Sequence, residues 1–271
     1  MPELPEVEST ARFLRERVKG ETITAVTVHW SRTVATHSAA KFSEAVEGQK
    51  ITDVGRRGKF VVFELAPGPE RLYAHMRMSG SFDVLSASIE SSKHDRLILT
   101  LSNGREIRFN DPRKFGRFYL DETPGTVVSK LGLEPLSEDF TVEHLLEVFK
   151  KHRGSIKPLL LRQDIVAGLG NIYVDEALWY ARIHPLRRSE TLKLSEIELL
   201  HQGIREILTE AISKAGTDFG DGVVEAGSYE PRVYGRGGKE CHRCGGVVKR
   251  IVVGQRGTHL CARCQRKPRV R

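Results

Sequence analysis

Cysteines and long apolar runs are both scarce in this 271-residue chain, which has four cysteines and no stretch of about eighteen consecutive apolar residues. A disulfide-stabilised scaffold of this length needs many more cysteines, and a membrane-spanning helix needs the missing apolar stretch. The first ten residues, MPELPEVEST, also lack the basic and then apolar segments of a cleaved signal peptide. We therefore expect a soluble, cytoplasmic protein without a disulfide framework or a membrane partner.

The basic charge is distributed unevenly along the chain. The whole sequence carries a net charge of +8, from 43 Lys and Arg against 35 Asp and Glu. Residues 231–271 alone hold twelve basic side chains and one acidic one, so this stretch is +11 and the rest of the chain is net negative. All four cysteines lie in the same stretch. A solvated basic tail explains residues 266–271, but the basic residues interleaved between 232 and 256 indicate contact with a polyanion.

Apolar periodicity divides the chain into two kinds of structure. Pro5 at a first helical position, followed by Val7, Ala11, Leu14 and Val18, predicts an amphipathic helix at the start. From residue 22 the period becomes two, in the segments TITAVTVHW, KITDV, KFVVFEL, RLYAHMRM, DRLILTL and EIRF. Turn-rich stretches separate these segments. This pattern predicts an antiparallel sandwich or flattened barrel that closes near residue 120.

The second half of the chain has a helical period. Apolar residues predict one helix around 142–149 and another over 172–183, and a capping box of Ser195 and Glu198 predicts a third that runs to about residue 214. The glycine-rich residues 216–238 have no period and predict a loop. We expect an α+β protein divided into 1–121, a linker at 122–135, a helical domain at 136–215, a loop at 216–236, and a cysteine module with a basic tail at 237–271.

The cysteines form two CxxC pairs, Cys241 with Cys244 and Cys261 with Cys264, separated by sixteen residues. This spacing is typical of two knuckles that supply four thiolates to one structural Zn²⁺. Two disulfides or four free thiols are the alternatives, but a cytosolic setting disfavours disulfides and the clustered spacing disfavours free thiols. Four thiolates leave no open position for water, so the metal is expected to organise structure.

Three other segments end at glycine turns. In AGLGN, Gly168 and Gly170 precede a predicted helix and are expected to present free backbone N–H groups to a phosphate, with Asn171 as a further donor. A tight interhelical turn explains the same residues. The segments HMRMSG at 75–80 and DPRKFG at 111–116 place Met78 and Phe115 at turn tips. Such side chains can wedge into a base stack, although they can also simply cap the core.

Taken together, these motifs resemble the formamidopyrimidine-DNA glycosylases, which are bacterial bifunctional base-excision repair enzymes. The match runs from residue 2 to 265, through PELPEVE, RRGKF, HMRMSG, DPRKFG, LGLEPL, IKPLLL, AGLGNIYVDEALW, YGR and GQRGTH with the CxxC pairs. The resemblance implies an N-terminal β-sandwich with flanking helices, and a C-terminal helix-two-turns-helix domain with a four-cysteine zinc finger. It implies a monomer that acts on damaged double-stranded DNA in the bacterial nucleoid without an organic cofactor.

The resemblance also assigns catalytic roles. Pro2 is the nucleophile, Glu3 is the general acid and base, Glu6 holds the chain start in place, and Lys59 binds the phosphate beside the damaged nucleotide. Removal of Met1 leaves Pro2 as a secondary amine, which is partly neutral near pH 7 and can attack a sugar carbon. Without the resemblance, Pro2 is only a turn residue at the chain start, and the two acids only suit a helix N-terminus.

The remaining predicted site residues contact DNA. Lys157 is expected near the lesion or its phosphate, while Asn171 and Arg256 grip phosphates on either side of the kink. The other residues that the resemblance assigns to DNA contact, including those that fill the void and wedge the opposite strand, are His75, Met78, Arg113, Phe115 and Tyr234.

One region departs from the family pattern. The lesion-recognition loop is shortened, and Gly220 stands where an arginine is usual. Backbone cleavage is expected to survive this change, but a preference for 8-oxoguanine does not follow. Two alternatives therefore stay open: an endonuclease VIII-like enzyme for oxidised pyrimidines, and a non-catalytic zinc protein that binds DNA. The segments HMRMSG and DPRKFG favour the oxidised-purine branch.

Overall fold

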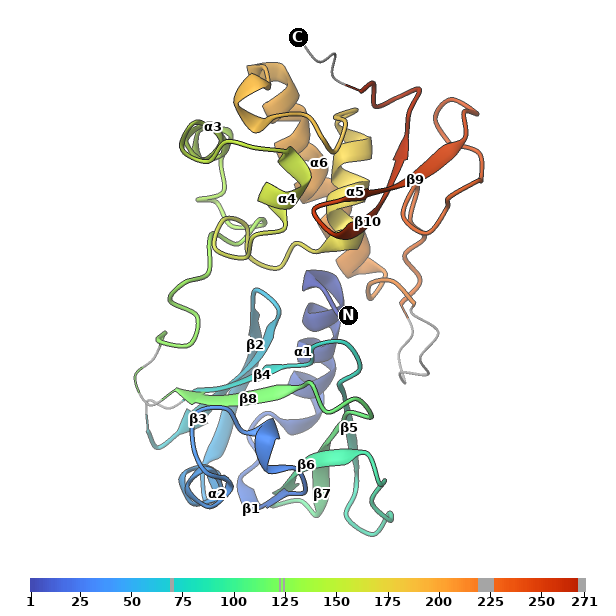
Figure 1. Cartoon of the computed structure of the whole chain (residues 1–271). Helices are drawn as coiled ribbons and strands as arrows, with labels where there is room; N and C mark the ends of the chain where they lie inside the picture. The colour runs from blue at the N-terminus through green and yellow to red at the C-terminus, as the bar shows by residue number, and fades with distance from the viewer. Residues whose placement is uncertain (69–70, 122, 124, 219–226, 268–271) are drawn as a thin grey trace. The chain divides into compact units, whose positions relative to one another are not determined.

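The computed structural model describes residues 1–68, 71–121, 123, 125–218 and 227–267. Its contacts divide the chain into two units (Figure 1). The N-terminal unit begins at Met1 and runs to Ser129, and the C-terminal unit comprises Lys130–Thr217 together with the chain from Gly227 onward. The finer division predicted from sequence stays a prediction.

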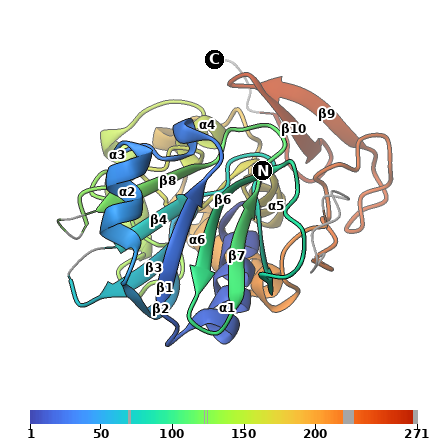
Figure 2. The same ribbon diagram turned by 90° about the horizontal axis from the view of Figure 1, so that it is seen from below.

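The N-terminal unit is built from two four-stranded antiparallel sheets, with strand orders β1-β6-β7-β5 and β2-β3-β4-β8. Figure 2 shows β1, β6 and β7 side by side. The elements in chain order are α1 (Leu4–Val18), β1 (Ile23–Val28), η1 (Ser31–Thr33), α2 (Ala39–Val46), β2 (Lys50–Arg57), β3 (Phe60–Ala66), β4 (Arg71–His75), β5 (Ser81–Ser86), β6 (Asp95–Leu101), β7 (Arg105–Asn110) and β8 (Arg117–Asp121). The predicted antiparallel sandwich is confirmed, and each of the six predicted strand segments contains a strand.

Aromatic side chains fill the space between the two sheets. Phe82 on β5 and Phe109 on β7 face Phe63 and Phe118 from the other sheet, and neighbouring ring centroids are 5.0 to 6.1 Å apart. All four rings are buried. Helix α1 packs against β2 and β3 of one sheet and β5 of the other, and it buries the four apolar residues that define its predicted face. The chain start is thereby fixed to the sandwich.

The C-terminal unit combines helices with a two-stranded hairpin. Its elements are α3 (Val142–Lys151), α4 (Ile156–Leu160), α5 (Asn171–Tyr180), η2 (Ser189–Thr191), α6 (Leu194–Ser213), β9 (Val248–Val253) and β10 (Arg256–Cys261). Helix α5 is central, because it packs against α4, α6 and β10. The predicted capping box at Ser195 and Glu198 is wrong. Glu196 Oε2 accepts the backbone N–H of Lys193 at 2.8 Å, so α6 begins at Leu194 and Ser195 lies inside its first turn.

Candidate functional site

The start of α1 holds two of the predicted catalytic acids. Glu3 is the N-cap residue, and Glu6 Oε2 accepts the Glu3 backbone N–H at 2.8 Å. Both carboxyl side chains are buried, at 3% and 9% exposure, and both lie at the positive end of the helix. Pro5 is the second helical residue, not the first as predicted. Pro2 is half-buried immediately before this cap, so its backbone direction is set by a rigid helix start.

Lys59 lies in the β2–β3 turn and His75 at the end of β4, in the same sheet. Lys59 follows Gly58, whose φ of 56° favours glycine, and its side chain is buried. His75 ends β4, and its ring lies 4.9 Å from the ring of Phe60. Burial, together with the charges of Arg77 and Lys59, lowers the pKa of His75 to about 3. His75 Nδ1 accepts the Arg77 backbone N–H at 3.0 Å, so the neutral ring carries its proton on Nε2 and is a donor there.

The two predicted wedge turns expose large side chains. Met78 and Phe115 are each 46% exposed, and the Arg113 guanidinium lies 5.0 Å from the centroid of the Phe115 ring. Neither turn tolerates a side chain at its closing glycine, because a Cβ at Gly80 would lie 2.6 Å, and one at Gly116 2.2 Å, from the Phe109 ring. Close packing on the core therefore fixes the two turns and leaves their apolar tips exposed.

A buried carboxylate joins the two turns, and sequence reasoning missed it. Asp111 is 1% exposed. Its Oδ1 accepts the Ser79 hydroxyl at 2.5 Å and the Arg113 backbone N–H at 3.2 Å, while its Oδ2 accepts the Gly116 backbone N–H at 2.7 Å. One side chain thus ties the segment that carries Met78 to the segment that carries Phe115. The adjacent Pro and Gly suggested only a turn, and nothing local in the sequence pointed to Ser79.

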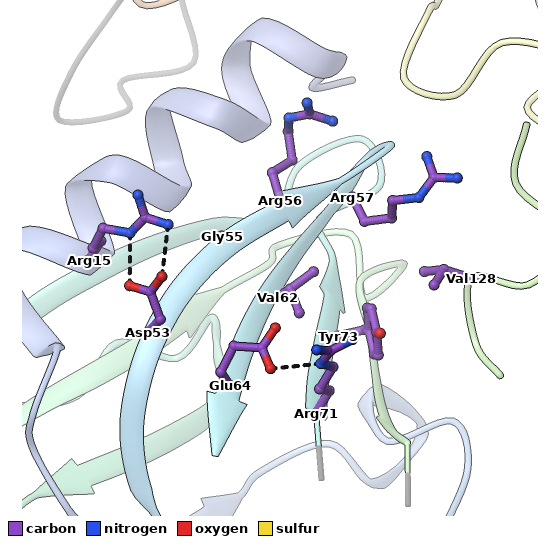
Figure 3. A pocket seen from close by; sticks show the side chains of 10 residues that line it. All are labelled: Arg15, Asp53, Gly55, Arg56, Arg57, Val62, Glu64, Arg71, Tyr73 and Val128. Carbon is purple, nitrogen blue, oxygen red and sulfur yellow. Dashed lines mark hydrogen bonds and ion pairs between the residues drawn. The ribbon is translucent and has the colours of Figure 1, made fainter. Parts of the chain in front are cut away.

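A pocket opens elsewhere on the N-terminal unit, over β2, β3 and β4 (Figure 3). Arg15 of α1 and Asp53 of β2 point toward one another there, with Nε and Oδ1 3.0 Å apart. Glu64 and Arg71 form a second ion pair at 2.6 Å. The predicted catalytic residues are not among its lining residues. This pocket belongs to the ion-pair network of the sheet.

In the C-terminal unit, the predicted phosphate loop is partly used internally. The Gly168 backbone N–H donates to Gln163 Oε1 at 3.0 Å, so the expectation of a free N–H at this glycine is wrong. Asn171 begins α5, and its Nδ2 donates to the Gly257 carbonyl at 3.0 Å. The side chain of Asn171 is thereby held against the start of β10.

Lys157 does not lie at the surface of its unit. Its side chain is fully buried, and its Nζ is 2.6 Å from Asp175 Oδ1. The predicted place of Lys157 near the lesion or its phosphate stays a prediction, and in this structure its charge is paired with Asp175. The motif IKPLLL gave no sign of this, because its acidic partner stands eighteen residues further along the chain.

Different contacts hold the two segments that carry Tyr234 and Arg256. Glu176, which is fully buried, accepts the backbone N–H groups of Arg232, Val233 and Tyr234 at 2.7 to 2.9 Å, and burial raises its pKa. Arg256 is exposed at the first position of β10. The predicted lesion-recognition loop includes Gly220 and its neighbours 219–226, which lie outside the described residues.

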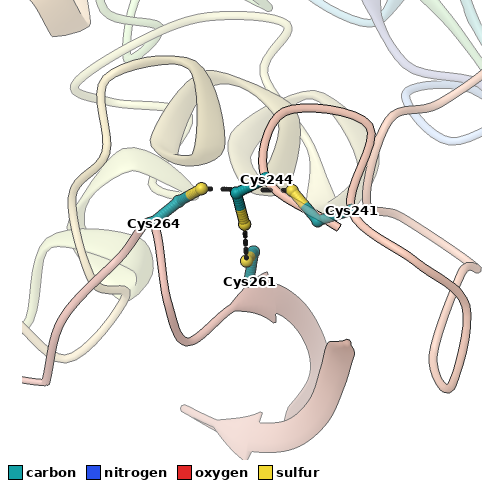
Figure 4. A group of neighbouring side chains, drawn as sticks. All are labelled: Cys241, Cys244, Cys261 and Cys264. Atoms are coloured by element: carbon teal, nitrogen blue, oxygen red, sulfur yellow. Dashed lines mark hydrogen bonds between the residues drawn. The ribbon is translucent and has the colours of Figure 1, made fainter. Parts of the chain in front are cut away.

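The four cysteine side chains converge on one point (Figure 4): Cys241 and Cys244 precede β9, Cys261 ends β10 and Cys264 follows it. Their sulfur atoms all lie within 4.8 Å of one another, with Cys244 and Cys261 at 3.5 Å and Cys241 and Cys264 at 4.0 Å. A tetrahedral zinc with Zn–S bonds of about 2.3 Å needs S···S separations of about 3.8 Å, so the cluster fits Zn²⁺. Burial disfavours the Cys241 thiolate, but hydrogen bonds from the Trp179 indole and from the backbone lower its pKa to about 6.

Comparison with known protein families finds a matching domain for each part of the chain. The formamidopyrimidine-DNA glycosylase N-terminal domain matches residues 1–118, the H2TH domain of the same enzymes matches 131–221, and the zinc finger found in FPG and IleRS matches 238–266. The fold is thus a β-sandwich joined to an H2TH helical unit, and the four cysteines form a structural zinc site. The chain belongs to the formamidopyrimidine-DNA glycosylase family.

Curated relatives and solved structures agree with this assignment. The formamidopyrimidine-DNA glycosylases of Herpetosiphon aurantiacus and of a Roseiflexus strain are 42% and 43% identical, and each comparison covers 98% of this chain and all of the relative. A mutant of the Lactococcus lactis FPG in complex with Fapy-dG-containing DNA superposes with a TM-score of 0.92 at 38% identity, over 98% of this chain and 100% of that one. The Lactococcus lactis enzyme with abasic-site DNA matches equally well. Across the described part of this chain, no helix has the length and apolar character needed to cross a membrane.

Proposed function

We propose that this chain is a monomeric DNA glycosylase and AP lyase that removes oxidised purines, such as 8-oxoguanine and formamidopyrimidines, from duplex DNA. Family membership over nearly the whole length supports the reaction class. The relatives solved with Fapy-dG, abasic-site and 8-oxo-G DNA support damaged duplexes as the substrate.

The reaction starts from Pro2 after Met1 has been removed. The neutral secondary amine attacks C1′ of the extruded nucleoside, the C1′–N bond to the base breaks, and the departing base takes up a proton. Glu3 protonates the ring oxygen, so the sugar opens to an iminium with Pro2. The iminium withdraws electrons as C2′ loses a proton and the 3′ phosphate leaves. A second elimination then releases the 5′ phosphate, and hydrolysis frees the proline.

The observation that carries this proposal is the helix cap next to Pro2. Glu3 and Glu6 are both buried, and the Glu3 backbone is held by the Glu6 carboxylate. A nucleophile one residue before this cap has its direction fixed, and an acid stands beside it. Such preorganisation lowers the entropic cost of bringing an amine to a sugar carbon.

The remaining residues bind and bend the DNA. His75 offers a neutral N–H donor and lies beside the cationic Lys59. These two groups together can bind a phosphate oxygen. Met78 and Phe115 are exposed on fixed turns, as side chains that enter a base stack must be. The four thiolates would hold one Zn²⁺ without an open position, and the ion would then stabilise the hairpin that carries Arg256. With about six phosphates neutralised, log K should fall with log salt at a slope near −5.

Borohydride trapping tests the catalytic proposal. Protein without Met1 should form a covalent adduct with duplexes that contain an abasic site or an oxidised purine, and Pro2→Gly, which replaces the secondary amine by a primary one, should strongly reduce the adduct. Glu3→Gln should strongly reduce base release. Glu8→Gln on the same helix is the matched control, because the partly exposed Glu8 is held in ion pairs with Arg12 and Arg56 and should leave trapping unchanged.

A panel of lesions separates the rival functions. Each lesion is placed opposite cytosine, and 8-oxoguanine and formamidopyrimidine should be excised faster than thymine glycol. A clear preference for thymine glycol would instead assign the chain to oxidised pyrimidines. Wild-type protein that binds the duplexes but is never trapped and never nicks would overturn the enzymatic proposal and leave a DNA-binding protein.

A further inference from the structure

Lys157 and Asp175 form a salt bridge that is completely enclosed by the C-terminal unit. Both side chains are 0% exposed, and their N···O distance is 2.6 Å. Charges lose their hydration when they are buried, and a pair of apolar side chains of similar volume is often at least as stable. Stability alone therefore gives no reason for this pair, so its hydrogen-bond partners are informative.

Three hydrogen bonds tie this pair and the neighbouring Asn171 to the start of β10. Lys157 Nζ donates to the Gly257 carbonyl at 3.2 Å, and the same carbonyl accepts Asn171 Nδ2 at 3.0 Å. The second carboxylate oxygen of Asp175 accepts the His259 backbone N–H at 2.7 Å. Two residues of the strand are thus held by side chains from α4 and α5.

The turn at the tip of the β9–β10 hairpin contacts helix α4, which carries Lys157. A Cβ at Gly254 would lie 3.0 Å from Cγ of Pro158, the residue after Lys157, so the hairpin turn and α4 are in close approach. Arg256 lies between this contact and the Gly257 carbonyl. Its backbone is therefore fixed on both sides, although its own side chain is exposed.

We propose that Asp175 is a positioning residue that, through Lys157 and His259, sets Arg256 at a fixed distance from Asn171 so that the two can hold DNA phosphates together. This inference rests on the proposed function, which assigns both residues to phosphate contact. The Gly257 carbonyl is the point of coupling, because it adjoins Arg256 and accepts the Asn171 amide. Lys157 acts within the protein here, and its charge is matched by Asp175.

The test compares DNA binding in variants that remove the whole pair. Lys157→Met with Asp175→Leu removes both charges and keeps apolar volume, so the fold and zinc content should be retained. Binding to a duplex with a stable abasic analogue should weaken at least tenfold. The slope of log K against log salt should become shallower by about 0.9 for each phosphate that the protein no longer neutralises. The nicking rate at saturating DNA should stay near that of the wild type.

Four further variants make the result specific. Arg256→Ala and Asn171→Ala define how much each phosphate-binding side chain adds to affinity. When K157M/D175L is combined with Arg256→Ala, the further loss of DNA affinity should be much smaller than tenfold, because the Arg256 side chain that the ion pair positions is already absent. R162M/D164N removes an exposed ion pair of the same unit, likewise without changing net charge, and should bind like the wild type.

The outcomes separate the two proposals. If Arg256→Ala and Asn171→Ala weaken binding but K157M/D175L does not, the positioning role is wrong and the pair serves only the fold. If neither alanine variant weakens binding, the phosphate assignment of the proposed function fails instead. Should K157M/D175L lose zinc or unfold, K157M/D175N keeps the volume and an acceptor for His259. This variant should still bind DNA several-fold more weakly than the wild type, and its log K should depend less steeply on log salt. If K157M/D175N binds DNA like the wild type, the inference is overturned.

Discussion

Replacing Asp111 by asparagine should destabilise the N-terminal unit by about 3 kcal/mol. The carboxylate accepts three hydrogen bonds at 2.5 to 3.2 Å and is 1% exposed. Asparagine has nearly the same shape, but it replaces one acceptor oxygen with an NH₂ group that faces a donor. A hydrogen bond to a charged group contributes about 1.5–3 kcal/mol, and an unsatisfied buried donor costs about 1–3 kcal/mol. Asp111→Asn loses one of these hydrogen bonds and turns the other two into weaker bonds to a neutral group, which gives a total of about 3 kcal/mol.

Urea unfolding followed by circular dichroism measures this loss. Asp164→Asn is the matched control, because Asp164 is half exposed in an ion pair with Arg162 and should cost less than about 1 kcal/mol. Ser79→Ala, which removes a single bond to Asp111, should fall between the two. A loss in Asp111→Asn no larger than that of the control would refute the view that this carboxylate holds the two turns together.

Three other predictions concern the zinc, a histidine and a helix contact. Removing zinc with a strong chelator should shift the emission of Trp179, whose indole donates to Cys241 at 3.4 Å, and should expose the hairpin amides to hydrogen exchange; unchanged emission and protection would contradict the zinc assignment. The pKa of His75 is lowered to about 3, so the unfolded chain binds a proton that the folded chain rejects below about pH 6.5. Stability should fall with decreasing pH by up to about 1.4 kcal/mol per unit in this window, and His75→Gln should flatten the profile measured by urea titration. Gly203→Ala should destabilise the C-terminal unit by about 1–3 kcal/mol in thermal unfolding, because a Cβ would lie 2.6 Å from the Tyr180 ring; a stabilised variant would show that α5 and α6 are not in close contact.

Periodicity and spacing predicted the features that depend on neighbours along the chain. The buried face of α1, the alternating strands and the two CxxC knuckles are all of this kind, because each is read within a few turns or strand residues. The family resemblance added the roles of Pro2 and Glu3, which local pattern alone leaves as helix-start residues. Those roles are proposals that the geometry of the cap supports.

Elements without a clear period were missed. Strand β5 reads SFDVLS and β8 reads RFYLD, and neither is among the segments predicted from the period of two. Helix α4 has only five residues, fewer than two turns, so no apolar face repeats within it. Their positions follow from pairing across the sheet and from packing on α5, which a single sequence does not display.

Contacts between residues that are distant along the chain also could not be predicted from the sequence. Asp111, Asp175 and Glu176 read as ordinary acidic residues of a turn and a helix, and a charged side chain is far more often exposed than buried. Their partners stand 32, 18 and more than 50 residues away. Only the fold shows that these carboxylates are enclosed and that Lys157 is buried beside one of them.

The buried acids explain how irregular segments hold side chains in fixed positions. A turn or loop has no ladder of backbone hydrogen bonds, so its N–H groups need other acceptors when they are buried. Asp111, Asp175 and Glu176 each accept backbone N–H groups from such a segment or from a strand edge. Charge-assisted bonds of this kind offset the cost of burying the carboxylate and leave the segment with one conformation. Phe115, Arg256 and Tyr234 lie on the three segments held in this way, so neutralising a buried acid should weaken DNA binding although the acid itself is enclosed.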